Sequence, residues 1–274
     1  MTNTVFHIRY NPINMRPRLT LLLLAWMLFA HDAKAQETAT FDHYAFARLG
    51  IFSGVRFYSI KDELISPHIY RGATVPLHLT YDRSTRITHF QVGFNFDKTL
   101  LTAPITEKQD FTGTLQKHFS DYWSLNFYGH FMSRIVAKDQ FRLLIGARLH
   151  ALGVYRKHTV VPKLPWDIGY GFINFQFSIL AQKNIFKKQW LDWQMAYGVG
   201  ALTLGNQYGR VFTGSGWKMA PKFQNIFSQF TYHIPWTEHL DSGIEYRFNY
   251  QAYEKDFPYQ LGSHQFLILL NYRL

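Results

Sequence analysis

Two histidines and a serine, His78, His89 and Ser124, are the residues whose types and spacing could support catalysis. If residues 82–85 form a tight hairpin turn, His78 faces His89 across that turn, and Ser124 on the following strand comes within a few residues of His89. A Ser–His–His row of this kind could supply a nucleophile, a base and an orienting group. The two imidazoles could equally form half of a metal site, although the sequence clusters no further ligands beside them.

The segment that carries Ser124 alternates polar and bulky apolar residues for almost its whole length. From Lys117 to Ile135, one set of alternate positions is polar and the other is mainly Phe, Trp and Leu. Because successive side chains of a strand point to opposite sides, the segment has one polar face and one apolar face. Strands of soluble proteins average about 5–6 residues, so a strand this long with two distinct faces is typical of a membrane-spanning β-barrel.

Ten segments of the chain keep this period of two, which predicts a single-domain, antiparallel, up-and-down barrel of ten strands, with eight or twelve as alternatives. Short connections alternate with longer ones along the chain, as they do in bacterial barrels, so both termini are expected at the periplasmic end. The longer, outer connections are expected at 58–70, 98–116, 157–166, 204–221 and 252–261. The strands are expected near 42–57, 71–82, 86–97, 117–134, 141–156, 167–181, 188–203, 222–234, 238–251 and 262–274.

Composition fits a barrel whose apolar face is turned outward. Aromatic residues make up 18% of the chain, yet the mean hydropathy is only −0.17. Strands that alternate apolar lipid-facing residues with polar interior residues have a mean hydropathy near zero. The alternative is a soluble β-sandwich or a lipocalin-like barrel, which would turn the same apolar face inward.

With the apolar face toward lipid, the polar face lines the barrel interior. Ten strands carrying large side chains should be mostly filled, with interior arginines paired to Asp192, Asp241 and Glu245. A catalytic row placed about 13 Å above the periplasmic end of a filled interior would be poorly placed for a lipid substrate. A layer of hydrogen bonds is therefore the favoured interpretation of His78, His89 and Ser124. The expected interior residues are His78, His89, Ser124, Asn126, His130, Arg142, Arg148, Asp192, Glu245 and Arg247.

The N-terminal segment has the features of a secretory signal. Arg16 and Arg18 precede an apolar run over residues 19–30, and an Ala-Lys-Ala sequence at 33–35 follows. This run is too short for a membrane helix, which needs about 20 residues. We therefore expect residues 1–35 to be a signal peptide, with Met15 as a possible true start, and residues 36–274 to be the barrel domain.

Charge and cysteine content narrow the function classes. The formal charge is +11 for the chain and +8 once residues 1–35 are removed. Because the basic residues are dispersed, attraction to anionic lipid headgroups or lipopolysaccharide phosphates is favoured over nucleic-acid binding. The absence of cysteine excludes a disulfide scaffold, a thiolate metal site and a cysteine nucleophile. No phosphate-binding loop or zinc-protease motif is present, so neither a cofactor nor a metal is expected.

The last strand, Phe266 to Leu274, resembles the C-terminal strand of Gram-negative outer-membrane β-barrel proteins, although the usual final residue of that class is Phe or Trp rather than Leu. The resemblance implies an outer-membrane location and recognition by the outer-membrane assembly machinery. It points to no particular family. The expected function is non-enzymatic, either binding of a surface ligand or partner protein through the outer connections, above all 98–116 and 204–221, or a small accessory pore. A lipid or peptide hydrolase and a narrow solute channel are the alternatives.

Overall fold

The computed structural model describes residues 45–62, 66–103, 119–138, 140–158, 166–186, 189–205, 216–219, 223–253 and 259–274. The expected signal peptide and most of the connections 98–116, 157–166 and 204–221 lie outside these ranges. None of the described residues belongs to a helix long and apolar enough to cross a membrane. The strands are β1 (Phe46–Asp62), β2 (Ser66–Thr74), β3 (Leu77–Ser84), β4 (Thr88–Thr102), β5 (Phe119–Lys138), β6 (Phe141–His158), β7 (Trp166–Asn184), β8 (Trp190–Gly205), β9 (Gly216–Met219), β10 (Phe223–Pro235), β11 (Leu240–Tyr253) and β12 (Tyr259–Arg273).

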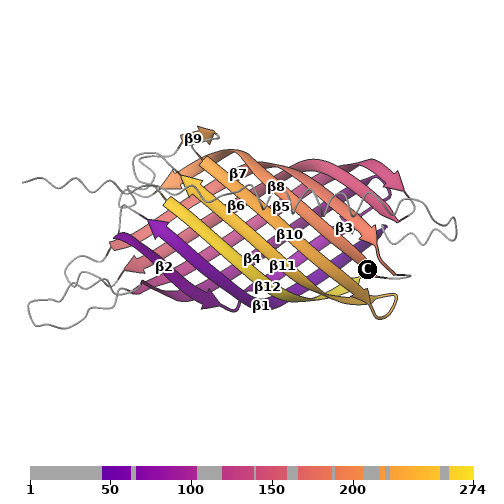
Figure 1. Cartoon of the computed structure of the whole chain (residues 1–274), viewed down its shortest axis with the longest axis horizontal. Coiled ribbons are helices and arrows are strands. Elements are labelled where there is room, and N and C mark those ends of the chain that lie inside the picture. The colour runs from indigo at the N-terminus through magenta and orange to yellow at the C-terminus, as the bar shows by residue number, and fades with distance from the viewer. Residues whose placement is uncertain are drawn as a thin grey trace, which may run out of the picture. The chain divides into compact units, whose positions relative to one another are not determined.

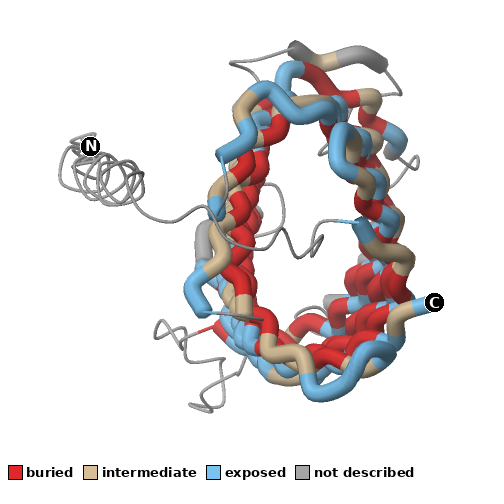
Figure 2. Tube along the Cα trace, turned by 90° about the vertical axis from the view of Figure 1, so that its right-hand side faces the viewer, coloured by how far each residue is buried: buried red, intermediate tan, exposed pale blue. Residues whose placement is uncertain are grey.

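The strands close into a ring in which every neighbour is antiparallel (Figures 1 and 2). β2 and β3 are two parts of one strand position, since both pair with β1 in the same register on either side of Val75 and Pro76. The ring closes where β12 pairs with β1, from Arg48 opposite Arg273 to Asp62 opposite Tyr259. With β2 and β3 counted together and the short β9 set aside, ten strand positions form the ring, as the sequence predicts.

The register sets the tilt of the strands. A circuit that starts at Phe46 and follows paired residues around the ring returns to β1 at Tyr58, a stagger of twelve residues. For ten strands, this stagger corresponds to a tilt of about 40° from the barrel axis. The strong slant of the strands is visible in Figure 1. The short turns and the C-terminus share one end of the barrel, here called the turn end, and the other is the loop end.

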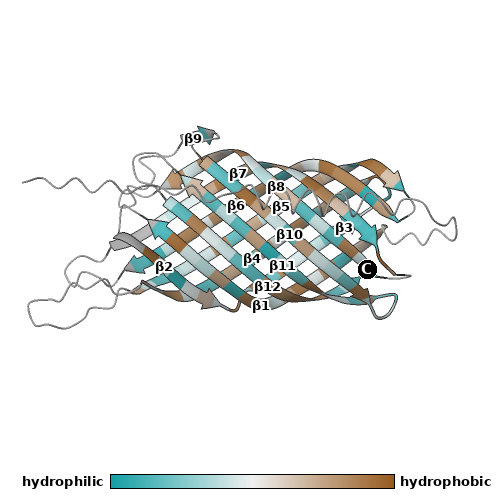
Figure 3. Cartoon of the chain, viewed as in Figure 1, coloured by the Kyte–Doolittle hydropathy of each residue, from teal (hydrophilic) through white to brown (hydrophobic). Residues whose placement is uncertain are grey.

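Burial alternates along the strands, and the exposed residues are the apolar ones, as a membrane requires. Leu267 is 1% exposed whereas its neighbour Ile268 is 71% exposed. The outward face is rich in Phe, Leu, Ile and Tyr, while Arg, Asp, His, Asn and Gln are buried on the inward face, which gives the alternating colours of Figure 3. A soluble protein would place these two sets the other way round.

The apolar exterior forms a belt that begins at the turn end. On β1 it runs from Leu49 to Phe57, where Ser53 is its one polar outward residue, and on β4 from Phe90 to Phe96. Nine residues at a tilt of about 40° rise roughly 23 Å, close to the ~25 Å apolar band of outer-membrane barrels. Because β1 and β4–β7 have 15–20 residues each, their loop-end portions extend beyond the belt.

Three expectations about local structure are wrong. The sequence near 42–57 gives the first strand no clear inward face, because Leu49 and Ile51 alternate with Phe46 and Arg48. In the structure, β1 has a definite inward face, which carries Arg48, Phe52 and Arg56. The connection expected at 58–70 shrinks to residues 63–65, because β1 and β2 continue as paired strands beyond the apolar belt. The first turn lies at Thr85–Thr88, where the Thr85 amide donates to the Thr88 carbonyl at 2.8 Å, and not at 82–85.

Candidate functional site

The barrel interior is where the polar chemistry of this chain is concentrated. The structure places all ten expected interior residues on the buried, inward side of their strands, each at most 7% exposed. They are His78, His89, Ser124, Asn126, His130, Arg142, Arg148, Asp192, Glu245 and Arg247.

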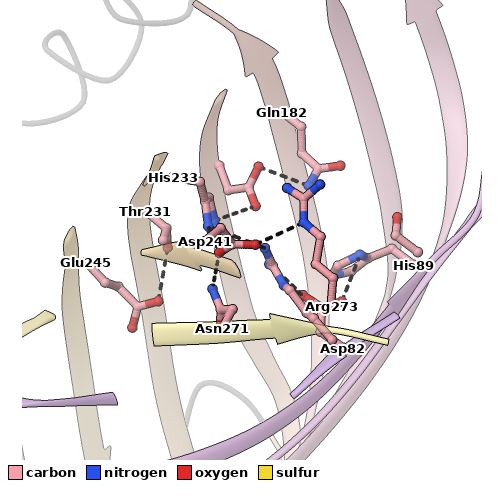
Figure 4. Close-up of polar contacts among 12 residues, drawn as sticks. Asp82, His89, Gln182, Thr231, His233, Asp241, Glu245, Asn271 and Arg273 are labelled. Atoms are coloured by element: carbon pink, nitrogen blue, oxygen red, sulfur yellow. Dashed lines mark hydrogen bonds and ion pairs between the residues drawn. The ribbon is translucent and has the colours of Figure 1, made fainter. Parts of the chain in front are cut away.

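A layer of ion pairs fills the interior at the turn end (Figure 4). Arg48 donates to Asp82 Oδ2 from Nη2 at 2.7 Å and from Nε at 3.1 Å. Asp241 accepts from Asn271 at 2.6 Å and from Arg273 Nε at 3.2 Å. The layer links β1, β3, β11 and β12, so the charges that it buries also hold the ring closed at this end.

His233 joins this layer to β8. Its Nδ1 lies 3.3 Å from Arg48 Nη1, and its Nε2 lies 3.3 Å from Asp192 Oδ2. Nδ1 also lies 3.8 Å from Asp241 Oδ1, so the ring sits between two carboxylates and an arginine. The Trp190 ring stacks on this imidazole with centroids 4.5 Å apart and an interplanar angle of 10°. Hydrogen bonds and stacking thus fix the imidazole in a single orientation.

Above this layer lies a small cavity of about 20 Å³. His89 and His130 border it, with their rings stacked at 5.0 Å, and Gln91 and Gln194 add amide groups. The volume is enough for about one water molecule, and polar walls suit one. Among the described residues, no three His, Asp or Glu side chains are arranged to hold a metal ion.

The middle of the interior is organised around Glu245 and Arg247, which form an ion pair. Glu245 also accepts from Gln229 at 2.8 Å and from Thr231 at 3.0 Å. Arg247 donates to His78 Nδ1 at 3.1 Å. His78 is therefore held by an arginine of β11 rather than placed to act as a base.

Asp97 is the centre of a second buried group, nearer the loop end. Its Oδ2 accepts from Arg56, from Tyr58 at 2.8 Å and from Ser124 Oγ at 3.1 Å. The serine hydroxyl therefore points at a carboxylate that already has two other donors, with no imidazole among its hydrogen-bond partners.

A cap of apolar and aromatic side chains closes the interior at the loop end. Tyr170 and Tyr259 meet there through their hydroxyls at 2.5 Å, and Phe172 packs edge-on against Phe223 at 5.4 Å. The members of this aromatic cap are Tyr58, Ile60, Tyr70, Leu101, Ala103, Tyr122, Leu152, Val154, Tyr170, Phe172, Ala201, Phe223, Tyr253, Tyr259 and Leu261.

The Ser–His–His row, which the sequence offered as the less favoured interpretation, is not formed. His78 pairs with Asn95, and His89 pairs with Ser84 on one side and Met132 on the other. Ser124 pairs with Asp97, eight residues along β4 from His89, which is about 27 Å at ~3.4 Å per residue. The turn lies three residues later than predicted, and this displacement shifts the hairpin register by six residues.

Sequence reasoning missed six arginine, aspartate and histidine residues of the interior, and Arg156 near the loop end of β6 is one of them. Asp82 was assigned to a turn, and Arg48 and Arg56 lay on a strand with no clear inward face. Continuing the alternation of β1 outward from Leu49 through Phe57 would have placed both arginines inside. Extending the inward positions of β4 and β10 by two residues would likewise have found Asp97 and His233.

Among known proteins, solved structures of β-barrels are similar to this chain. No protein-family model and no curated protein matches this chain. The outer membrane protease OmpT from Escherichia coli matches at 8% identity and a TM-score of 0.46, over 88% of this chain and all of that one. The translocator domain of the autotransporter NalP from Neisseria meningitidis matches at 9% identity and 0.44, over 95% of this chain and 97% of that one. The transport unit of the autotransporter AIDA-I from Escherichia coli matches at 11% identity and 0.42, over 97% of this chain and all of that one.

None of these similarities is close enough to transfer an activity. The class of the protein follows from its own structure, through the closed antiparallel ring, the apolar belt and the polar interior. The chain is a transmembrane β-barrel of the outer-membrane class.

Proposed function

We propose that this protein is a non-enzymatic, non-conducting barrel that holds its outer connections at the cell surface, where they bind a ligand or a partner protein. The observation that carries the proposal is the filled interior. The aromatic cap closes the loop end, ion pairs fill the turn end, and the cavity between them has room for about one water molecule.

Planar-bilayer recording tests the filled interior. The refolded protein is expected to give no stepwise conductance in molar potassium chloride, because an ion would have to displace both the aromatic cap and the ion-pair layer. Regular, reproducible conductance steps from the purified protein would favour the narrow channel or the accessory pore instead.

The hydrolase alternative receives its own test. Ester and phospholipid hydrolysis by the protein in detergent micelles should not exceed that of empty micelles. Activity that disappears in Ser124→Ala or His89→Ala would contradict the non-enzymatic proposal. Ser133→Ala is the matched control, since Ser133 is an exposed serine on the same strand.

The orientation is part of the same proposal, with the turn end and both termini in the periplasm. Export by residues 1–35 and insertion by the assembly machinery precede this state. The chain has no cysteine, so single cysteines report the orientation cleanly. A membrane-impermeant maleimide should label Thr102→Cys on intact cells, and it should label Glu238→Cys only after the outer membrane is permeabilised. The reverse pattern would contradict the proposed orientation.

A further inference from the structure

Four basic side chains project outward from one wall of the barrel, beyond the loop-end margin of the apolar belt. Lys61 lies on β1, Arg71 on β2, Lys98 on β4 and Lys157 on β6. Arg71, Lys98 and Lys157 are exposed, and Lys61 is half-buried. We call these four residues the basic strip.

The described outward positions of the opposite wall, formed by β7, β8 and β10–β12, do not repeat this feature. Among the residues whose side chains are described, the outward positions at the loop ends of β7, β8 and β10–β12 include no lysine or arginine, and Lys218 on the short β9 is the nearest basic residue. Residues at similar positions there are Ile173, Leu202, Leu204 and Gln260. Among the described outward positions of the long strands, the basic side chains at the loop end therefore lie on the wall of β1–β6.

Within the basic strip, Lys98 is tied to the aromatic margin of the belt. Its ammonium nitrogen lies 4.2 Å from the centroid of the Trp123 ring, which contacts Phe96 edge-on at 5.9 Å. Lys98 pairs with Trp123, and Trp123 pairs with Tyr155, two residues from Lys157. The α-carbons of Lys98 and Lys157 therefore lie roughly 12 Å apart along the wall.

Below the basic strip, the same wall presents a continuous apolar surface. Phe94, Phe96, Leu125 and Phe127 are all exposed there, directly on the turn-end side of Lys98 and Trp123. A molecule that lies along this wall therefore contacts apolar side chains over most of its length and basic side chains at the loop end. An acyl chain with an anionic headgroup has the same order of parts.

We propose that the wall formed by β1–β6 is a binding site for a phosphorylated lipid of the outer leaflet. The phosphate groups contact Lys98, Lys157 and Arg71, and the acyl chains lie on the apolar surface below. This inference rests on the proposed orientation, which puts the loop end at the outer leaflet. A soluble polyanion would leave the apolar part of the site unused, so a lipid is the occupant that fits both parts.

Asp121 is the one acidic side chain described among the outward loop-end positions of this wall, and it pairs with Lys157 across β5 and β6. A carboxylate beside the cations lowers their attraction for a phosphate. Removing it should therefore strengthen lipid binding, whereas removing lysines should weaken it. The two opposite expectations separate a binding site from general damage to the barrel.

The test measures binding of bisphosphorylated lipid A to the full barrel in dodecyl maltoside micelles, by native mass spectrometry and by quenching of tryptophan with brominated lipid. Lys98→Gln/Lys157→Gln should weaken binding by roughly tenfold, since each basic residue near an anionic surface contributes several-fold. Asp121→Asn should strengthen binding about twofold to threefold. Raising the salt concentration should weaken wild-type binding.

The matched control is Arg83→Gln/Arg134→Gln, which removes the same charge from exposed positions at the turn end of the same wall. Its affinity should change by less than about twofold. An equal loss in both double variants, equal binding of phosphatidylcholine, or equal binding of inorganic phosphate would overturn the proposal. Micelles have no sides, so failure here is distinguishable from a wrong orientation, which the cysteine labelling reports.

Discussion

At the scale of single residues, the buried ion pairs dominate the interior. Arg48 is 5% exposed and Asp82 is 1% exposed, and Arg48 also contacts His233 and Asp241. Arg48→Met leaves Asp82 without its main partner, and an unpaired buried charge destabilises a protein by about 3–5 kcal/mol. We expect a loss of this size in the free energy of unfolding, measured by urea titration in lipid vesicles.

A double variant shows that pairing causes this effect. Arg48→Met/Asp82→Leu removes both charges together, so it should be less destabilising than the sum of the two single variants, with a coupling of at least ~1 kcal/mol. Arg134→Met, at an exposed position, should change stability by less than about 0.5 kcal/mol. Additive single effects would mean that Arg48 stabilises the barrel through packing rather than charge.

At the scale of strands, two glycines of β6 differ in the space that the neighbouring strands leave for a side chain. A Cβ added to Gly146 would overlap the Phe131 carbonyl oxygen of β5, whereas a Cβ on Gly153 would meet nothing within 4 Å. Gly146→Ala should therefore force β5 and β6 apart and destabilise the barrel by about 1–3 kcal/mol. Gly153→Ala should be neutral or stabilising by up to ~1 kcal/mol. Comparison of the two unfolding curves checks the register between β5 and β6, and equal effects would contradict it.

The strands also show what a sequence can predict. Alternation gave the ten strand positions and the inward residues of β5, because the membrane imposes one polarity on each face for the length of the belt. The register of β3 on β4 could not be predicted in this way, since alternation allows any shift by an even number of residues. Asp82 looked like a turn residue, and only its ion pair with Arg48 of the neighbouring strand shows why β3 continues to Ser84.

A bulge on β8 marks another limit of the pattern. Phe175 pairs with Gly200 while Gln176 pairs with Gly198, so Val199 is an extra residue that reverses the inward and outward positions beyond it. Ala196 and Gly198 are buried before the bulge, and Ala201 and Thr203 after it. A period of two cannot show a single extra residue among small side chains.

At the scale of the whole molecule, the barrel has a filled interior and an outer surface whose two walls carry different side chains. Its interior is occupied by the ion-pair layer and the aromatic cap, so we place its interactions on the loop-end rim and the basic strip. Both proposals depend on the same arrangement, in which the bulky apolar residues face lipid and the polar residues face the axis.

The most direct measurement of that arrangement is a nitroxide scan along β5. Single cysteines at positions 125, 126, 127 and 128, in a chain with no native cysteine, carry the label in reconstituted bilayers. Oxygen, which concentrates in lipid, should relax labels at 125 and 127 strongly and those at 126 and 128 weakly. Equal accessibility at all four positions, or strong relaxation at the even ones, would contradict the account.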